Sequence, residues 1–296
     1  SHFTSQDIYS LGVRGDFGPL GIDESGWIAR FADLYAPTPL GAVSIGVGRP
    51  LDFVGGTSNP FLVANLANFR FLPDNTYPNG HLYRLETAKD VLDGYSPTGL
   101  EAEVAEAVGQ GYDLADQIQT AVASYSSNVT YGTQNIQRFL RDVAILVQYG
   151  FETKIFFTGF GGFDTHANQG AATGNQANLF TRLDTALGAF AQDMKDMGVW
   201  DQTVIVIITE FGRRNFQNGS NGTDHGHGNS FVLLGGGVNG GMYGDDLTEA
   251  DLNLDYPGYE TDFRDIYRDV INGHLGHDPA PVFPESQPKN SVLGIT

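Results

Sequence analysis

Three short apolar runs constrain the fold of this chain more than any other feature of its sequence. They are TKIFFTG (residues 153–159), TVIVIIT (203–209) and SFVLLGGG (230–237). Short apolar runs rich in Val, Ile and Phe and bounded by turn residues are typical of buried strands. Because these runs are continuously apolar instead of alternating with polar residues, we expect strands of a parallel sheet that is covered on both faces.

Stretches with helical periodicity surround these runs. The predicted helices cover residues 26–35, 101–124, 133–149, 176–197 and about 261–275. A short opening helix is expected to stop at Gly12, and the helix over 101–124 to be broken near Gly109 and Gly111. AVSIGVG (42–48) predicts a further strand, and 59–100 reads as an irregular excursion with a short helix.

This order of strands and helices predicts an α/β fold with a mostly parallel central sheet and helices on both faces. We expect one domain over residues 1–296 with an irregular excursion near 50–130, because no Ser/Pro-rich linker or low-complexity segment divides the chain.

Charge and composition exclude several classes of function. Asp plus Glu number 35 against 16 Lys plus Arg, a net charge of −19 that repels nucleic acid, so no nucleic-acid partner is expected. The chain has no cysteine, which excludes disulfides, thiolate catalysis and Cys-based zinc sites. No stretch approaches the ~18 consecutive apolar residues of a membrane span. The chain opens SHFTSQDIYSLG, without Met or signal peptide, and is expected to be a processed product or a fragment.

Three polar clusters adjoin the predicted strands. They are Asp164 with His166 after the first run, Glu210 with Arg213 and Arg214 after the second, and Asp224 with His225 and His227 before the third. Parallel α/β sheets gather their ligands at the strand ends, so neighbouring strands would bring these side chains to one rim. Carboxylates and imidazoles suit zinc, manganese or iron, and an oxygen-rich subset suits calcium or magnesium.

Each cluster also has a structural interpretation. Asp164 could cap a helix, and Glu210 could pair with a neighbouring arginine in a solvated salt bridge. The stretch DHGH (224–227) could be a turn whose Asp and Gly supply the backbone geometry. Each alternative is credible for its own cluster. The presence of all three clusters beside predicted strands favours a metal site.

Several motifs in a fixed order resemble a bacterial family, domain of unknown function 1501. They are the opening SHFTSQD, then GGFDTH, TEFGRR, DHG, GGGVNGGMYG and the closing TDFRDIYRDVINGHLG. The resemblance spans nearly the whole chain. It implies export by the twin-arginine route, and therefore a periplasmic or extracellular location in a bacterium.

That family is similar to the alkaline phosphatase and sulfatase superfamily, and this likeness implies site residues. Asp164 and His166 match its first ligand pair, Glu210 falls at the Asp of a T-x-DHG motif, and His225 or His227 falls at a later histidine. The sequence departs from the pattern where TEFG replaces T-x-DHG, so Phe211 stands in the position of one histidine ligand.

A second departure lies at the N-terminus, where the superfamily's first strand has no counterpart. The resemblance places Ser1 or His2 at the nucleophile position, so a separate N-terminal fragment or companion chain would supply the missing strand. The leading hypothesis is thus an exported metal-dependent hydrolase of a small anionic phosphate or sulfate ester. Asp164, His166, Glu210, Asp224, His225 and His227 would be ligands of zinc, manganese or iron, with Ser1, His2 and Arg213 catalytic. The alternative is a non-catalytic envelope protein that retains the fold and holds structural calcium.

Overall fold

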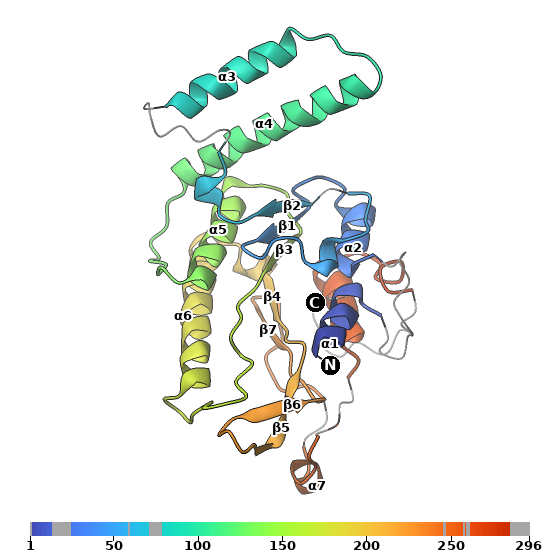
Figure 1. Ribbon diagram of the computed structural model, residues 1–296, viewed down its shortest axis with the longest axis vertical. Helices are drawn as coiled ribbons and strands as arrows, with labels where there is room; N and C mark the ends of the chain where they lie inside the picture. The colour runs from blue at the N-terminus through green and yellow to red at the C-terminus, as the bar shows by residue number, and fades with distance from the viewer. Residues whose placement is uncertain are drawn as a thin grey trace.

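The computed structural model describes residues 2–13, 25–58, 60–70, 79–244, 247–256, 258 and 261–284. Over these residues the chain is a mixed α/β protein with a small parallel sheet, helices on both of its faces, and two helices that project from one end (Figure 1).

The parallel sheet has three strands in the order β2–β1–β3. The strands are β1 (Ala42–Ile45), β2 (Phe61–Val63) and β3 (Ile155–Thr158), with Val43 opposite Phe61 and Ala42 opposite Ile155. β3 confirms the strand predicted from TKIFFTG, and β1 the strand predicted at 42–48. β2 lies inside the stretch for which an irregular excursion was expected.

Helices cover this sheet on both faces, as expected. α4 (Leu100–Ser124), α5 (Asn135–Tyr149) and α6 (Asn175–Asp196) form one core with β1 and β2, centred on side chains such as Ile45, Ile118 and Leu146. On the other face α2 (Trp27–Tyr35) packs Ile28 and Ala32 against Ala42. α8 (Phe263–Asp269), continued by a π-helical turn over Val270–His274, packs Tyr267 and Ile271 with Phe31 of α2. The amphipathic helices predicted near these ranges are therefore confirmed.

The other two predicted strands pair differently from the expectation. β4 (Val204–Ile207) and β7 (Val232–Gly235) pair antiparallel, with Val204 opposite Gly235. Among the described residues they share no ladder with β3. The prediction of parallel strands at 203–209 and 230–237 was wrong because parallel neighbours need a crossover connection, usually a helix, between them. The segment between β4 and β7 instead holds an antiparallel hairpin, β5 (Gly212–Gln217) and β6 (Thr223–Gly226).

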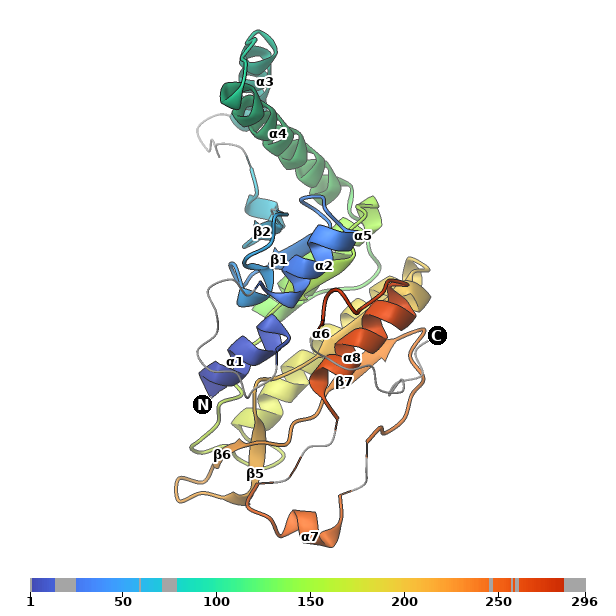
Figure 2. The same cartoon turned by 90° about the vertical axis from the view of Figure 1, so that its right-hand side faces the viewer.

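A helical arm projects from the body (Figure 2). It consists of α3 (Gly80–Asp93) and the first half of α4, and an ion pair of 2.8 Å between Lys89 and Asp113 joins the two helices. The predicted break in α4 is wrong: the helix runs through Gly109 and Gly111 without interruption. Both glycines lie in open space, and an interior glycine costs a helix only about 1 kcal/mol relative to alanine.

The opening helix α1 (His2–Leu11) ends at Gly12, whose φ of +66° is the left-handed conformation that glycine adopts readily. Tyr9 packs edge-on against Phe263 at a centroid distance of 4.5 Å. The described residues also form the short helix α7 (Glu249–Leu252) and 3₁₀ turns at Leu51–Phe53, Leu66–Asn68 and Trp200–Gln202. In the described part of the chain, no helix is long and apolar enough to cross a membrane.

Candidate metal centre

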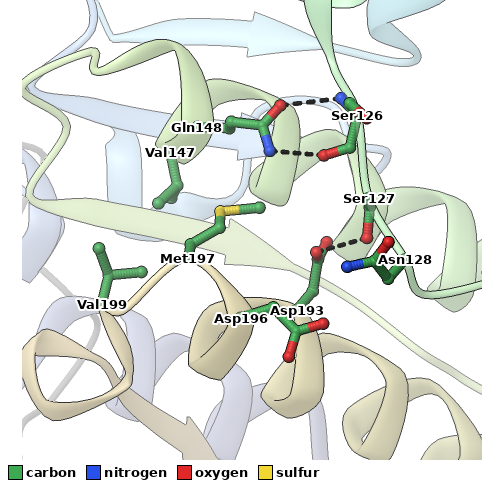
Figure 3. Close-up of a pocket in the computed structure, with 9 residues that line it drawn as sticks. All are labelled: Ser126, Ser127, Asn128, Val147, Gln148, Asp193, Asp196, Met197 and Val199. Carbon is green, nitrogen blue, oxygen red and sulfur yellow. Dashed lines mark hydrogen bonds between the residues drawn. The ribbon is translucent and has the colours of Figure 1, made fainter.

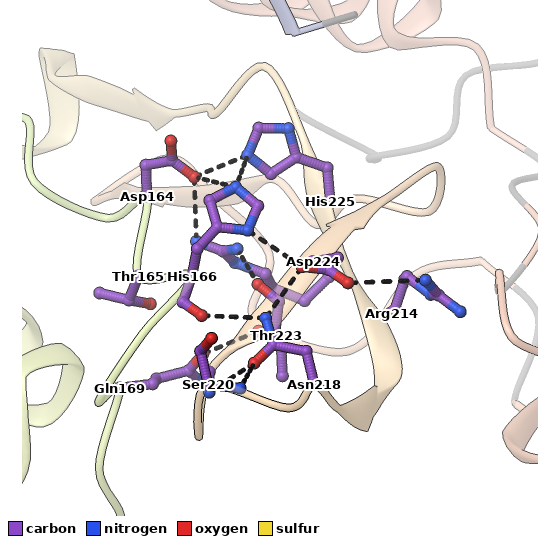
Figure 4. A network of polar contacts seen from close by, with 12 residues as sticks. Asp164, Thr165, His166, Gln169, Arg214, Asn218, Ser220, Thr223, Asp224 and His225 are labelled. Atoms are coloured by element: carbon purple, nitrogen blue, oxygen red, sulfur yellow. Dashed lines mark hydrogen bonds and ion pairs between the residues drawn. The ribbon is translucent and has the colours of Figure 1, made fainter.

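The loop after β3 lies against the β5–β6 hairpin, and this contact brings the first and third polar clusters together (Figure 4). The main-chain N–H of Asn168 donates to the carbonyl of Ser220 at 3.0 Å, and that of Gln169 donates to Asn221 at 3.0 Å. Gly222 lies so close to the carbonyl of His166 that a Cβ there would be 2.2 Å from the oxygen. The hairpin can approach the loop because this position has no side chain.

Three potential ligand atoms converge at this contact. Asp164 Oδ1 lies 2.6 Å from Nε2 of His225 and 2.9 Å from Nε2 of His166, and the two Nε2 atoms are 3.1 Å apart. Ligand atoms that share one ion at about 2.0–2.2 Å lie roughly 3 Å from one another. The spacing of the Asp164, His166 and His225 atoms therefore fits a common divalent ion. We call these three residues the DHH group.

The second nitrogen of His166 is held by Asp224. Nδ1 of His166 lies 3.1 Å from Asp224 Oδ1, and because an ionised carboxylate only accepts hydrogen bonds, Nδ1 carries the proton. In the neutral ring, Nε2 then presents a lone pair to Asp164 Oδ1 and to His225. Lone pairs that face each other at this distance require a proton or a cation between them. The carboxylate–histidine arrangement is the one that commonly orients a histidine ligand of a metal.

Side chains around the DHH group fix its rings. Asn218 donates from Nδ2 to Asp224 Oδ1 and to the carbonyl of His166, both at 2.9 Å. Phe211 stacks on the ring of His225 at 3.8 Å between centroids and an interplanar angle of 13°. Phe211 therefore supports the ring of one member of the group.

Electrostatics keep both carboxylates ionised. Burial acts to raise the pKa of Asp164, but the hydrogen bond from His225 and the charges of His166 and Arg213 outweigh it and lower that pKa. The Asn218 hydrogen bond, followed by that from His166, lowers the pKa of Asp224. Both groups are therefore available as anions at neutral pH.

The two arginines are engaged with the protein itself. Arg213 donates to the main-chain oxygens of Phe163 and Thr223, which ties the loop to the hairpin. Arg214 pairs with Asp255, donating from Nε at 2.8 Å, and lies 3.6 Å from Asp224 Oδ2. The predicted catalytic role of Arg213 stays a prediction.

Two further predicted site residues, Glu210 and His227, lie outside the DHH group. Among the described residues, Glu210 and His227 have no ligand atom in the group that could hold one ion. Glu210 Oε1 accepts a hydrogen bond of 3.0 Å from Gln6 of α1, and the ring of His227 lies 4.9 Å from that of Tyr256. Ser1 and the side chain of His2 lie outside the described residues, so the predicted nucleophile is untested.

Sequence reasoning missed Asn218 as a site residue, although the chain held a signal for it. The stretch QNGSNGT (217–223) contains two Asn-Gly pairs, and Asn-Gly is a strong hairpin signal. Reading a hairpin there would have placed Asn218 beside Asp224.

A separate cavity of about 380 Å³ lies between the segment after α4 and the ends of α5 and α6 (Figure 3). Its lining includes Ser127, Gln148 and Asp193 but no member of the DHH group. Asp193 accepts hydrogen bonds from Ser127 at 2.5 Å, Tyr125 at 2.6 Å and Tyr131 at 2.9 Å. These bonds anchor the segment to α6.

The geometry defines an α/β protein with an aspartate and two histidines placed to hold a metal ion. Residues 85–282, more than half of the 296-residue chain, match the family described as "Protein of unknown function (DUF1501)". The chain therefore belongs to this family, as its motifs predicted, and the whole DHH group lies within the matched part. No curated protein and no solved structure matched the chain.

Proposed function

We propose that this chain is a metal-dependent hydrolase that acts on a small anionic phosphate or sulfate ester. The observation that supports this proposal is the convergence of Asp164 Oδ1 with the Nε2 atoms of His166 and His225 within 2.6–3.1 Å. Two imidazoles and one carboxylate favour zinc, manganese or iron over calcium, which prefers oxygen ligands. When bound, such an ion would polarise the ester and activate a nucleophile.

The chain's own residues would position the reacting groups. Asp224 would hold the ring of His166 through Nδ1, and Phe211 would hold that of His225. Arg214 lies 3.6 Å from Oδ2 of Asp224, and it could turn from Asp255 toward an anionic ester. A guanidinium binds a phosphate or sulfate through two parallel hydrogen bonds, which a chain of net charge −19 needs locally.

The relation to the alkaline phosphatase and sulfatase superfamily, and export to the periplasm or beyond, belong to this proposal. Both rest on the motif resemblance. A second candidate is a non-catalytic exported protein that holds structural calcium. The loss of one superfamily histidine to Phe211 favours that candidate.

Metal analysis of the purified protein tests the proposal. After chelation, the protein would be loaded separately with Zn²⁺, Mn²⁺, Fe²⁺ or Ca²⁺ and analysed by elemental mass spectrometry. We expect the wild type to bind one equivalent of zinc, manganese or iron per chain. His166→Ala and His225→Ala should fail to retain this metal. The same samples would be assayed with an aryl phosphate and an aryl sulfate.

His227→Ala is the matched control because it removes a histidine that lies outside the DHH group, two residues after His225. It should retain the metal. Turnover of either ester that disappears with the metal supports a hydrolase. Calcium alone, or no bound metal, with both assays blank would refute it and leave the non-catalytic candidate.

A further inference from the structure

α4 carries one apolar stripe along its whole length. Leu100, Val104 and Val108 recur at intervals of four residues, and Ala115, Ile118 and Val122 continue at intervals of three or four past Gly111. Such spacing places these residues on one side of a helix. A continuous stripe of this kind is the surface by which a helix packs against a partner.

Only the second half of the stripe is covered in the described structure. Ala115 and Ile118 are 6% and 0% exposed and belong to the core that α4 shares with α5. In contrast, Leu100, Val104 and Val108 are 74%, 56% and 38% exposed. Figure 2 shows why: the first half of α4 extends beyond the body, past the end of the helices that cover the second half.

α3 packs on a different side of α4. Its Lys89 pairs with Asp113, nine residues after Val104. Nine residues make about two and a half helical turns, so Asp113 points away from the stripe. The uncovered stripe therefore lies opposite the ion pair that joins the two helices.

Charge decides what kind of partner fits this surface. Residues 79–124 hold eight acids and two bases, a net charge of 2 − 8 = −6. The bases are Arg84 and Lys89, and the acids are Glu86, Asp90, Asp93, Glu101, Glu103, Glu106, Asp113 and Asp116. A second copy would bring the same acidic rim against itself, and like charges across an interface oppose association. A partner with basic residues beside an apolar stripe is complementary.

We propose that the exposed stripe of α4, formed by Leu100, Val104 and Val108, docks a basic amphipathic helix of another protein. The apolar residues of that helix cover the stripe, and its Lys or Arg residues meet Glu101 and Glu103, which flank the stripe. Apolar residues that recur every three or four positions are the ones by which an amphipathic helix is recognised. The inference is independent of the metal centre.

Binding of a designed peptide tests the surface. The probe is a fluorescent, ~18-residue helical peptide with a Leu stripe flanked by Lys, and its control has the same stripe flanked by Glu. Anisotropy titrations would use the full chain as wild type, Val104→Asp and Val91→Asp. Val91 lies on α3 and is 66% exposed, so its variant makes the same change at a similarly exposed valine outside the stripe.

We expect the Lys peptide to bind the wild type and Val91→Asp alike, and Val104→Asp at least about tenfold more weakly, because a charge replaces a buried contact. The Glu peptide should bind far more weakly than the Lys peptide. If the Lys peptide does not bind the wild type, the proposal is overturned. Equal binding to Val104→Asp and Val91→Asp also overturns it, because the peptide would then respond only to the general negative charge of the chain. Sedimentation of the protein alone is the other test: a dimer that Val104→Asp dissociates would assign the stripe to a second copy and overturn the proposal.

Discussion

At the scale of single residues, the position of His166 between two carboxylates sets the chemistry of the candidate centre. Nε2 faces Asp164 at 2.9 Å and Nδ1 faces Asp224 at 3.1 Å. A carboxylate on the Nδ1 side fixes both the tautomer and the ring orientation, and it makes Nε2 a stronger ligand. Asp224 is thus suited to orient a ligand, whereas Asp164 is suited to be one.

This difference predicts different losses on substitution. Asp224→Ala should weaken metal binding by about 10–100-fold, the usual effect of removing a partner of a ligating histidine. Asp164→Ala, which removes a ligand atom, should weaken binding more. The measurement is competition with a chromogenic chelator. Asp255→Ala is the control, because it removes a carboxylate that also contacts Arg214 but does not contact His166. Equal losses for Asp224→Ala and Asp255→Ala would mean that only the general negative charge matters.

At the scale of elements, the helices could be predicted from the sequence more readily than the strand pairing. α5 and α6 follow from apolar residues at helical spacing, which is a local signal. An apolar run such as 203–209 signals a buried strand but carries no information about its partner or direction. β5 and β6 are polar because one side of the hairpin carries the site, so their periodicity is weak and predicts no strand.

The same distinction applies to the candidate site. Asp164, His166 and His225 were predicted because they flank apolar runs, and the structure brings them together. Glu210 and His227 flank the same runs but lie apart from the group. Proximity to a strand end in the sequence does not determine which way a side chain points, and the hairpin places His225, not His227, beside Asp164.

Asp142 of α5 links two elements and provides a pH-dependent test. Its Oδ2 accepts a hydrogen bond of 3.1 Å from the main-chain N–H of Leu66, after β2. Burial raises the pKa of Asp142, and the Leu66 hydrogen bond only partly opposes it. A raised pKa in the folded state means that the protonated carboxyl stabilises the fold fully below the unfolded pKa, and that this stabilisation is lost as pH rises through the folded pKa.

Asp142→Asn should therefore raise the melting temperature at neutral pH, because the amide keeps an acceptor without a buried charge. The gain should shrink as pH falls through the raised folded-state pKa of Asp142, where the native carboxyl gains its proton. Thermal melts from pH 4 to 7 would measure it. Asp116→Asn, which removes a charge from an exposed position on α4, controls for the fall in net charge. A gain that is as large for Asp116→Asn, or independent of pH, would contradict the role of burial.

At the scale of the whole molecule, the acidic excess opposes folding. Thirty-five acids against 16 bases give a net charge of −19, and the compact state brings these charges closer together than the unfolded chain does. Salt screens such repulsion: the Debye length falls from about 30 Å at 0.01 M to about 8 Å at 0.15 M. Stability at neutral pH should therefore rise with ionic strength.

For the chelated protein at pH 7, we expect NaCl to raise the melting temperature by about 2–4 °C between 0.01 and 0.15 M, which corresponds to roughly 1 kcal/mol. Chelation removes any metal from the DHH group, so that metal binding does not contribute to the change in melting temperature. The same salt series near pH 4 should give a smaller rise, because about half of the carboxylates are then protonated and the net charge is lower. A rise of the same size at both pH values would point to general salting-out of apolar surface, and a flat response at pH 7 would mean that charge repulsion does not limit the stability of this fold.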